Sequence, residues 1–422
     1  MRAGLIIALA IPTLMLTESF AQVCSNTSVG LPPLNDLGTG FYRGLQGGLY
    51  PGGENVRPQA HNAAGLAIAH QIRPLDVDGN PDDVQGKIVL LSVGMSNTMQ
   101  EFQYLQTFVD SIGNKNPNLV LINGAQGGQD IDQIIDSTDS FWQRILDTLT
   151  THGLTVRQVQ VIWFKEAEAN PLVGNDTAFV AYLASLTMRF KIAMNIIKAK
   201  YENAQLCYVA SRIYGGYSTY DLNPEPFAWY TGWTVKQMIE EQINGDSDLV
   251  YSGPNPRSPW LAWGSYLWAD GTSPRSDGLT WICPDDYLPD GIHPSAVGRT
   301  KVANILLDFF MNDETTVPWF LDSTQTGVGT SQSSLPISYD VTNYPNPFNP
   351  STIIRFELPV ARHATLIVYD LLGREVERLI DGEIAAGVHE VQFTPPAKAS
   401  GVYIYRLVAG LNTASGRMVL VK

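Results

Sequence analysis

The sequence has few of the residues that build metal centres or basic surfaces. Its 422 residues include 3 cysteines and 6 histidines, and the spacing of the cysteines matches no zinc site. Its 27 Lys and Arg against 41 Asp and Glu give a formal net charge of −14 at pH 7. A surface this acidic repels phosphate backbones and offers no basic patch to anionic membranes, so we expect no nucleic-acid partner.

Long apolar runs are absent beyond the N-terminus. Residues 1–21 begin with Arg2, continue through a short apolar run and end in Ser19-Phe20-Ala21, which places small residues where a leader is cleaved. This pattern predicts a signal peptide that is removed before Gln22. No later stretch reaches the roughly 18 apolar residues that a membrane-spanning helix needs. We therefore expect an exported protein with no stable membrane span.

An odd number of cysteines leaves at least one thiol unpaired in an exported chain. Cys207 lies within QLCYVAS, a strand-like run in which a buried, unreactive thiol is the ordinary role. A disulfide between Cys24 and Cys283 is possible, and the sequence supports it no further.

The chain is too long for one small core, and its 44% hydrophobic and 16% charged residues are an ordinary globular composition. Between residues 87 and 312, short apolar runs alternate with stretches of helical periodicity. The expected strands are 87–94, 119–123, 159–164 and 205–211, with a weaker candidate at 248–253, and the expected helices are 98–112, 139–152, 177–201, 228–244 and 295–311. Apolar strands alternating with helices predict a parallel sheet covered on both faces, which is a doubly wound α/β domain.

The segments on either side of this domain differ from it in composition. Residues 22–85 are rich in Gly, Pro and Asn and predict an ordered loop that caps the sheet. Within them DVDGNPDD (76–83) resembles a calcium loop, but a surface turn is the commoner origin of such a sequence and is preferred. Residues 313–342 predict a Ser/Thr/Gly-rich linker. Residues 343–422 contain alternating runs separated by turns, which predict a small C-terminal β-sandwich.

Loops at the carboxyl ends of parallel strands are where doubly wound domains place their sites. The first expected strand runs into Ser96 and a helix follows, so helix amide groups would face a developing oxyanion. An ordinary helix cap explains a serine at this position equally well. After the second strand, residues 123–130 contain three glycines, whose backbone can approach a ligand closely and present N–H groups. A tight turn is the alternative interpretation of that loop.

A third loop, Asp290-Gly291-Ile292-His293, precedes the last expected helix. His293 would take the proton of Ser96, and Asp290 would hold the imidazole in the required tautomer. A single histidine is more often structural than catalytic. This one, however, follows the last sheet element with an acid beside it, which favours a catalytic role.

These three blocks resemble the SGNH (GDSL) hydrolase superfamily over residues 86–312. GMSN is similar to its nucleophile block, NGAQGGQ to its oxyanion-glycine block and DGIHPS to its acid–histidine block, in the family's order. The resemblance implies a flavodoxin-like sheet in three layers (α/β/α), with Ser96 as nucleophile and Asp290 and His293 as its partners. It implies the amides of Ser96 and Gly128 as oxyanion donors, and it implies no metal and no organic cofactor.

The sequence departs from the family at two places. Met95 replaces the aspartate before the serine, an acid that is not a triad member. The third block, where the family has Gly-x-Asn-Asp, reads Trp163-Phe164-Lys165-Glu166-Ala167, so the oxyanion asparagine is missing. We expect Lys165 to supply a charged donor instead, with Glu166 paired to it. A surface Lys–Glu pair is an equally good interpretation.

Polar side chains beside these loops are candidate substrate contacts: Asn97, Gln126, Glu166 and Arg212. Arg212 follows the fourth expected strand, where either a substrate-binding guanidinium or an ion pair within the fold would suit it. The segment before the acid–histidine loop is rich in tryptophan: Trp260, Trp263, Trp268 and Trp281. Such rings can stack on sugars, but packing is the slightly preferred interpretation for each.

The C-terminal segment resembles a second family. The sequences YPNPFNPSTIIRFELP, YDLLGREV, GVYIYRL and GRMVLVK are similar to the type A sorting domain of type IX secretion over residues 343–422. The resemblance implies passage across an outer membrane by the type IX machinery, and no catalytic residue in this domain.

Together these features predict a secreted or surface-exposed serine esterase that removes ester groups, acetyl in the first instance, from a carbohydrate. The expected partners are an ester-bearing small molecule or acylated polysaccharide and the type IX secretion machinery. A general carboxylesterase or lipase is the alternative among enzymes, and a long apolar lid would favour it. The alternative outside enzymes is a surface carbohydrate-binding protein that has lost activity through the altered third block.

Overall fold

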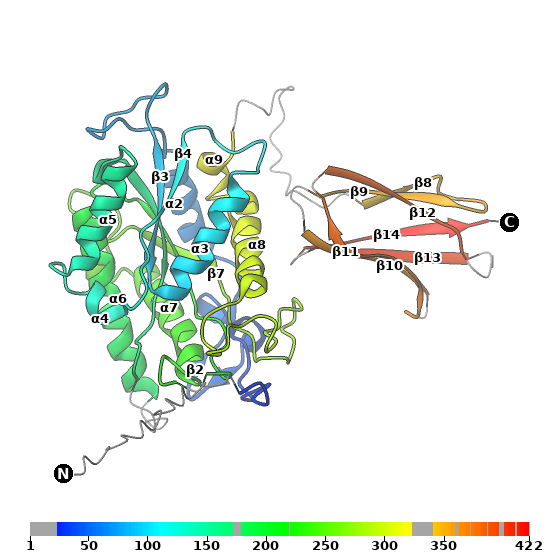
Figure 1. Ribbon diagram of the computed structural model, residues 1–422, viewed down its shortest axis with the longest axis horizontal. Coiled ribbons are helices and arrows are strands. Elements are labelled where there is room, and N and C mark those ends of the chain that lie inside the picture. Colours follow the sequence, from blue (N-terminus) through cyan, green and yellow to red (C-terminus); the bar gives the residue numbers. More distant parts are fainter. Residues whose placement is uncertain are drawn as a thin grey trace, which may run out of the picture.

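A computed structural model describes residues 23–171, 179–218, 220–322, 341–358, 362–371, 373–385, 387–395, 401–409 and 412–421. The expected signal peptide and most of the expected linker lie outside these residues. The described chain comprises an α/β domain and a C-terminal pair of antiparallel sheets (Figure 1).

The α/β domain is built on a five-stranded parallel sheet. Its strands are β3 (Ile88–Gly94), β4 (Leu119–Asn123), β5 (Val159–Lys165), β6 (Leu206–Ala210) and β7 (Trp260–Ser265). They lie in the order β4-β3-β5-β6-β7, and every neighbouring pair is parallel. This is the flavodoxin-like order, and it confirms the expected fold class. All residues of β3, β5 and β6 are buried, as expected for strands covered on both faces.

Helices cover both faces of this sheet (Figure 1). One face is covered by α3 (Ser96–Val109) and α8 (Ala296–Asn312), and the other by α5 (Ser140–Thr151), α6 (Phe179–Lys200) and α7 (Phe227–Ile243). Each of these five helices was expected from the sequence, and the observed bounds lie within three residues of the expected ones. Among the described helices, α6 alone is long and apolar enough to cross a membrane by length and composition, and its buried side chains pack in the domain core.

The structure corrects two expected elements of this domain. The fifth strand is β7, rather than 248–253, where a 3-10 turn (Ser247–Leu249) precedes a proline-rich loop. The Asp246 side chain caps this turn by accepting from the Asp248 amide, and Val250 and Tyr251 are not buried, whereas all of WLAWGS except its last residue is buried. Residues 313–322 belong to the domain rather than to a linker, because α9 (Val317–Phe320) buries Trp319 and Phe320 completely.

The N-terminal segment of the described chain covers the edge of the sheet that β7 forms. It holds α1 (Leu34–Leu37), β1 (Phe41–Tyr42), β2 (Leu45–Gln46), a 3-10 turn (Pro51–Gly53) and α2 (Gln59–Ala69). The helix α2 was not expected from the sequence, since its Ala-rich run has weak periodicity. Its His61 bonds the Leu261 carbonyl of edge strand β7 at 2.8 Å, and Tyr50 accepts from the Trp263 amide at 3.2 Å. Polar groups of the edge strand are thus satisfied by this segment.

The structure also decides three smaller expectations, on the cysteines, on DVDGNPDD (76–83) and on the tryptophans. Cys24 and Cys283 form a disulfide, and Cys207 is a free thiol that is fully buried. In DVDGNPDD the Asp76 carboxylate accepts from the amides of Asp78 and Asn80, which makes this segment a surface turn. The four tryptophans are buried to 96% or more and pack in the core: Trp260, Trp263, Trp268 and Trp281.

The C-terminal sheets form a β-sandwich with its own core. One sheet has the order β11-β10-β13-β14 and the other β12-β9-β8. The strands are β8 (Val341–Tyr344), β9 (Thr352–Leu358), β10 (Arg362–Asp370), β11 (Glu375–Ile384), β12 (Gly387–Phe393), β13 (Gly401–Ala409) and β14 (Asn412–Leu420). Alternate residues of β9 and β13, including Ile354, Phe356 and Leu407, are buried between the sheets. This confirms the expected small sandwich.

Candidate active site

Ser96 is the first residue of α3, directly after β3. Met95 keeps an extended conformation (φ −86°, ψ −171°), so the chain turns from strand to helix at Ser96. Gly94 makes this turn possible, because a Cβ at that position would lie 2.1 Å from the Lys165 carbonyl oxygen of β5. Within the described residues the Ser96 amide has no hydrogen-bond acceptor, as expected for the first turn of a helix.

A chain of hydrogen bonds connects Ser96, His293 and Asp290. His293 Nε2 lies 2.8 Å from Ser96 Oγ, and His293 Nδ1 lies 2.7 Å from Asp290 Oδ2. The second carboxylate oxygen of Asp290 accepts from the amides of Ile292 at 2.9 Å and His293 at 3.0 Å. The acid is therefore held by its own loop, with one oxygen left for the imidazole.

The environment of Asp290 keeps it ionised. Partial burial raises the pKa of this carboxyl, but the hydrogen bonds from the His293 ring and from the two loop amides outweigh it and lower the pKa to about 2. An ionised Asp290 accepts the Nδ1–H of His293. The lone pair of Nε2 then faces the Ser96 hydroxyl, which is the arrangement that a general base requires.

The glycine loop after β4 lies beside Ser96. A Cβ built on Gly127 would lie 4.0 Å from Ser96 Cβ, and the Gln126 amide bonds the Gly94 carbonyl at 2.9 Å. Gly128 adopts φ +73°, a conformation that favours glycine, and its amide has no acceptor among the described residues. Two N–H groups, of Ser96 and Gly128, thus border one cavity.

The structure does not place Lys165 at the oxyanion position. Its ammonium is fully buried and bonds Glu101 of α3 at 2.6 Å, rather than pairing with Glu166. Burial lowers the pKa of Lys165 to about 8 and raises the pKa of Glu101. The Lys165 carbonyl also accepts from Thr98 Oγ1 at 2.6 Å. Through its carbonyl and its ammonium, Lys165 therefore connects the C-terminal end of β5 to the first two turns of α3, the helix that begins at Ser96.

Glu101 was missed by sequence reasoning, although its position carries a signal. It stands four residues before Leu105 on the buried face of α3, where an acid needs a partner. The other third-block residue, Glu166, is fully buried, and its Oε1 accepts from the Ala167 amide at 2.8 Å. Burial, reinforced by Asp130, raises the pKa of Glu166 well above its usual value, and its Oε2 has no hydrogen-bond partner among the described residues.

The remaining predicted contacts divide between the cavity and its surroundings. Asn97 and Arg212 line the cavity with Ser96, whereas Gln126 is not among its lining residues. The Gln126 amide group donates to the Gly124 and Phe141 carbonyls, which fixes the glycine loop instead. Glu166 likewise does not line it.

The cavity beside Ser96 and His293 has a volume of about 610 Å³ and several unpartnered polar atoms. Five of the residues that line the cavity each have one buried polar atom without a hydrogen-bond partner among the described residues: Asn97 Oδ1, Gln100 Oε1, Gln129 Oε1, Arg212 Nε and Asn223 Oδ1. Buried polar atoms without partners are rare in folded proteins, so this cavity has the character of a polar ligand site.

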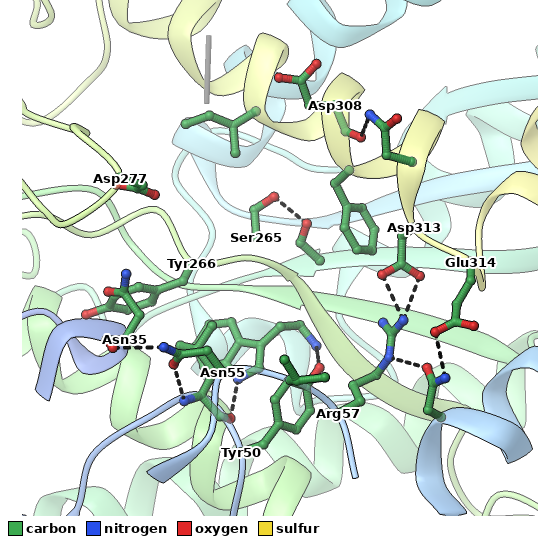
Figure 2. A pocket seen from close by; sticks show the side chains of 18 of the residues that line it. Asn35, Tyr50, Asn55, Arg57, Ser265, Tyr266, Asp277, Asp308, Asp313 and Glu314 are labelled. Atoms are coloured by element: carbon green, nitrogen blue, oxygen red, sulfur yellow. Dashed lines mark hydrogen bonds and ion pairs between the residues drawn. The ribbon is translucent and has the colours of Figure 1, made fainter. Parts of the chain in front are cut away.

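A second cavity of about 640 Å³ lies along the edge strand β7, between the N-terminal segment and α8 (Figure 2). It shares no lining residue with the first. Each of its two arginines is paired with an aspartate: Arg57 forms two bonds of 2.8 and 2.9 Å with Asp313, and Arg275 Nε bonds Asp277 at 2.9 Å. The network of Figure 2 is therefore largely satisfied by the protein.

Comparison with known proteins gives only remote likenesses. No family model and no curated protein matches the sequence. Among solved structures, a putative GDSL-like lipase from Parabacteroides merdae is 13% identical, with 55% of this chain and 96% of that chain covered and a TM-score of 0.31. Salicylyl-acyltransferase SsfX3 from a tetracycline biosynthetic pathway is 15% identical, with 54% of both chains covered and a TM-score of 0.27.

A further match is PorZ, a surface component of the type-IX secretion system of Porphyromonas gingivalis. The match is 17% identical and covers 19% of this chain, with a TM-score of 0.15. It covers 11% of the length of PorZ. At these identities and TM-scores, none of the likenesses carries an argument about activity. The functional interpretation therefore depends on the site itself.

Proposed function

We propose that this protein is a serine hydrolase that cleaves carboxylic esters through an acyl-enzyme, with Ser96 as nucleophile. The observation that carries the proposal is the hydrogen-bonded series Ser96–His293–Asp290 at the rim of a cavity. A serine hydroxyl is a weak nucleophile until a base removes its proton, and this series supplies that base together with the acid that orients it.

In the proposed reaction Ser96 Oγ attacks the ester carbonyl while His293 Nε2 takes the hydroxyl proton. The carbonyl oxygen gains negative charge and receives hydrogen bonds from the amides of Ser96 and Gly128. His293 then passes its proton to the leaving alkoxide, and the acyl group stays on Ser96. Water, deprotonated by the same imidazole, attacks the acyl-enzyme and releases the carboxylic acid and the free serine.

The oxyanion site in this proposal has two backbone donors and no third side chain. Lys165, which would have been the third, is committed to Glu101. Loss of one donor costs about 3 kcal/mol of transition-state stabilisation in other serine hydrolases. We therefore infer a slower enzyme than one with three donors, acting on a reactive ester such as the acetyl group of an acylated carbohydrate.

Covalent labelling by a fluorophosphonate tests the proposal without knowledge of the substrate. The purified chain should be labelled at Ser96 and should hydrolyse p-nitrophenyl acetate, and Ser96→Ala should lose both, with a fall of about 10⁴-fold or more in kcat. Ser111→Ala is the matched control, because Ser111 is exposed beyond the end of the same helix. If wild type and Ser96→Ala behave alike, Ser96 is no nucleophile and a binding protein on this fold becomes the better description.

For the C-terminal sandwich we propose a sorting role in type IX secretion. Its support is the sequence resemblance over residues 343–422, together with a core separate from that of the α/β domain. The test is removal of residues 341–422 in a host with that secretion system. The truncated chain should accumulate inside the outer membrane, and equal export of both chains would contradict the proposal.

A further inference from the structure

Arg212 is a buried cation without a dedicated counter-ion. It is 2% exposed, and no carboxylate of the described residues lies within ion-pair distance of its guanidinium. Its Nη1 lies 4.0 Å from Met95 Sδ, a weak acceptor, and its Nε has no partner in the described chain. A guanidinium stripped of water and left unpaired is costly, so its retention in a cavity indicates a ligand.

The carboxyls that act on Arg212 from a distance are engaged elsewhere. Glu101 is bonded to Lys165, and Glu166 Oε1 accepts from the Ala167 amide, while Glu166 Oε2 has no hydrogen-bond partner in the described chain and forms no ion pair with Arg212. Glu225 accepts from the amides of Gly215 and Trp229 and from the Trp268 indole. Arg212 therefore remains the positive group of the cavity that contains Ser96.

Two asparagines add hydrogen-bond acceptors on the same cavity wall. Asn97 donates its amide to the Ile292 carbonyl at 3.1 Å, and Asn223 donates to the Glu168 carbonyl at 3.1 Å. These bonds orient both side chains, so that each Oδ1 is left as an unpartnered acceptor at 1% and 3% residue exposure. Asn223 adopts φ +54°, a left-handed conformation that asparagine tolerates better than most residues.

An unpaired guanidinium beside two oriented acceptors is complementary to a ligand that carries an anionic group and hydroxyl groups together. We propose that the substrate is an ester of an acidic sugar, whose anionic group binds Arg212 and whose hydroxyl groups donate to Asn97 and Asn223. This inference rests on the proposed function, in that the ester is cleaved at Ser96. The anion of such a sugar is a carboxylate or a sulfate ester, and both accept the guanidinium fork.

The kinetic test compares three substrates that differ only in the group at C6, which is neutral in one and anionic in two: the mono-O-acetyl esters of methyl glucoside, methyl glucuronoside and methyl glucoside 6-sulfate. Wild type should hydrolyse at least one charged ester with a kcat/KM about ten- to a hundred-fold above the neutral one, which corresponds to one charged hydrogen-bonded contact. The charged ester that is preferred identifies the anion. In Arg212→Met the ratio of charged to neutral substrate should fall to near one, and Arg212→Lys should restore part of it.

Stability separates substrate binding from a structural role. If Arg212 serves the substrate, Arg212→Met removes an unpaired buried charge and should melt at the wild-type temperature or above it. The inference is overturned if wild type does not distinguish charged from neutral esters, or if the preference survives in Arg212→Met. Should Arg212→Met fail to fold, the residue is structural, and an unchanged ratio in Arg212→Lys would confirm that reading.

A binding measurement keeps this inference separate from the esterase proposal. Ser96→Ala is titrated with methyl glucuronoside, methyl glucoside 6-sulfate and methyl glucoside by calorimetry, and the double variant Ser96→Ala/Arg212→Met is the control. Binding of a charged sugar that is lost in the double variant supports the ligand class even if no ester is hydrolysed. Ester hydrolysis without such binding would retain the proposed function and reject the acidic sugar.

Discussion

The two large cavities of the α/β domain are similar in volume and opposite in the state of their polar groups. In the cavity along β7, each arginine is bonded to an aspartate, and one lining atom, Asn35 Oδ1, has no partner in the described chain. In the cavity beside Ser96, five lining residues each have such an atom. Polar groups satisfied within the protein serve the fold, whereas groups left unsatisfied are available to a ligand.

This difference explains why the larger cavity is the less attractive candidate. An anionic ligand in the β7 cavity would have to displace Asp313 from Arg57, and the displaced carboxylate would then need a new partner. In the Ser96 cavity Arg212 Nε has no partner among the described residues, and no ion pair has to break before the guanidinium accepts an anion. Cavity volume alone would therefore not identify the better candidate.

The largest expected effect concerns Asp290, the acid that is hydrogen-bonded to His293 beside the Ser96 cavity. Asp290→Asn keeps the shape of the side chain but can donate to His293 Nδ1, which favours the tautomer with its proton on Nε2 and removes the base. We expect kcat for p-nitrophenyl acetate to fall by about 10⁴-fold, while the variant stays folded at the assay temperature. Asp285→Asn, at an exposed aspartate of the preceding turn, is the control and should retain activity. A fall of less than ten-fold would contradict the triad.

The next effect is on stability and concerns the buried pair below Ser96. Lys165→Met leaves Glu101 fully buried without its cation, and we expect the free energy of unfolding to fall by about 3–5 kcal/mol. The double variant Lys165→Met/Glu101→Leu should recover most of that loss, because it removes both charges. The control is Arg157→Met, whose exposed pair with Glu202 should matter by less than about 1 kcal/mol. Chemical denaturation measures all three, and a stable single variant would show that Lys165 and Glu101 are not coupled.

The buried pair also shows where sequence reasoning succeeds and where it fails. The order of strands and helices follows from periodicity, so Ser96, the glycine loop and His293 could be placed at one sheet edge from the sequence. The partner of Lys165 could not, because Glu101 lies on α3 and pairs across 64 positions of chain. A motif suggested Glu166 as the neighbour, but side chains of adjacent residues in an extended segment point in opposite directions.

Pairing of polar groups is likewise beyond sequence reasoning. Arg57 and Arg212 are both arginines near the ends of the domain's elements, and nothing in their neighbours distinguishes them. The distinction arises because Asp313 reaches Arg57 from the segment after α8, while Glu101 is drawn away from Arg212 by Lys165. Only the folded arrangement decides which cation is left for a ligand.

Substituting the two arginines in parallel tests the comparison of the cavities directly. Arg57→Met should lower the free energy of unfolding by about 2–3 kcal/mol, because it leaves Asp313 and Asn62 without their charged donor. Arg212→Met should not lower it, because no ion pair is lost and the contact with Met95 Sδ is weak. Urea denaturation of both variants gives the difference. Equal destabilisation would mean that Arg212 serves the fold as Arg57 does, and the contrast between the cavities would then disappear.

The smallest expected effect is the contribution of Asp290 to stability at low pH. Its pKa in the folded chain is about 2 against an ordinary value of 3.8, so folding favours the ionised form. The contribution is complete above pH 4 and is lost as the pH falls through the folded pKa near 2, and for this partly exposed group it amounts to about 1–2 kcal/mol. The difference in unfolding free energy between wild type and Asp290→Asn should therefore be constant from pH 7 to pH 5 and shrink below pH 4. A difference that does not change down to pH 2 would mean that the bonds of the Asp290 carboxylate to its own loop and to His293 do not favour its ionised form in the folded chain.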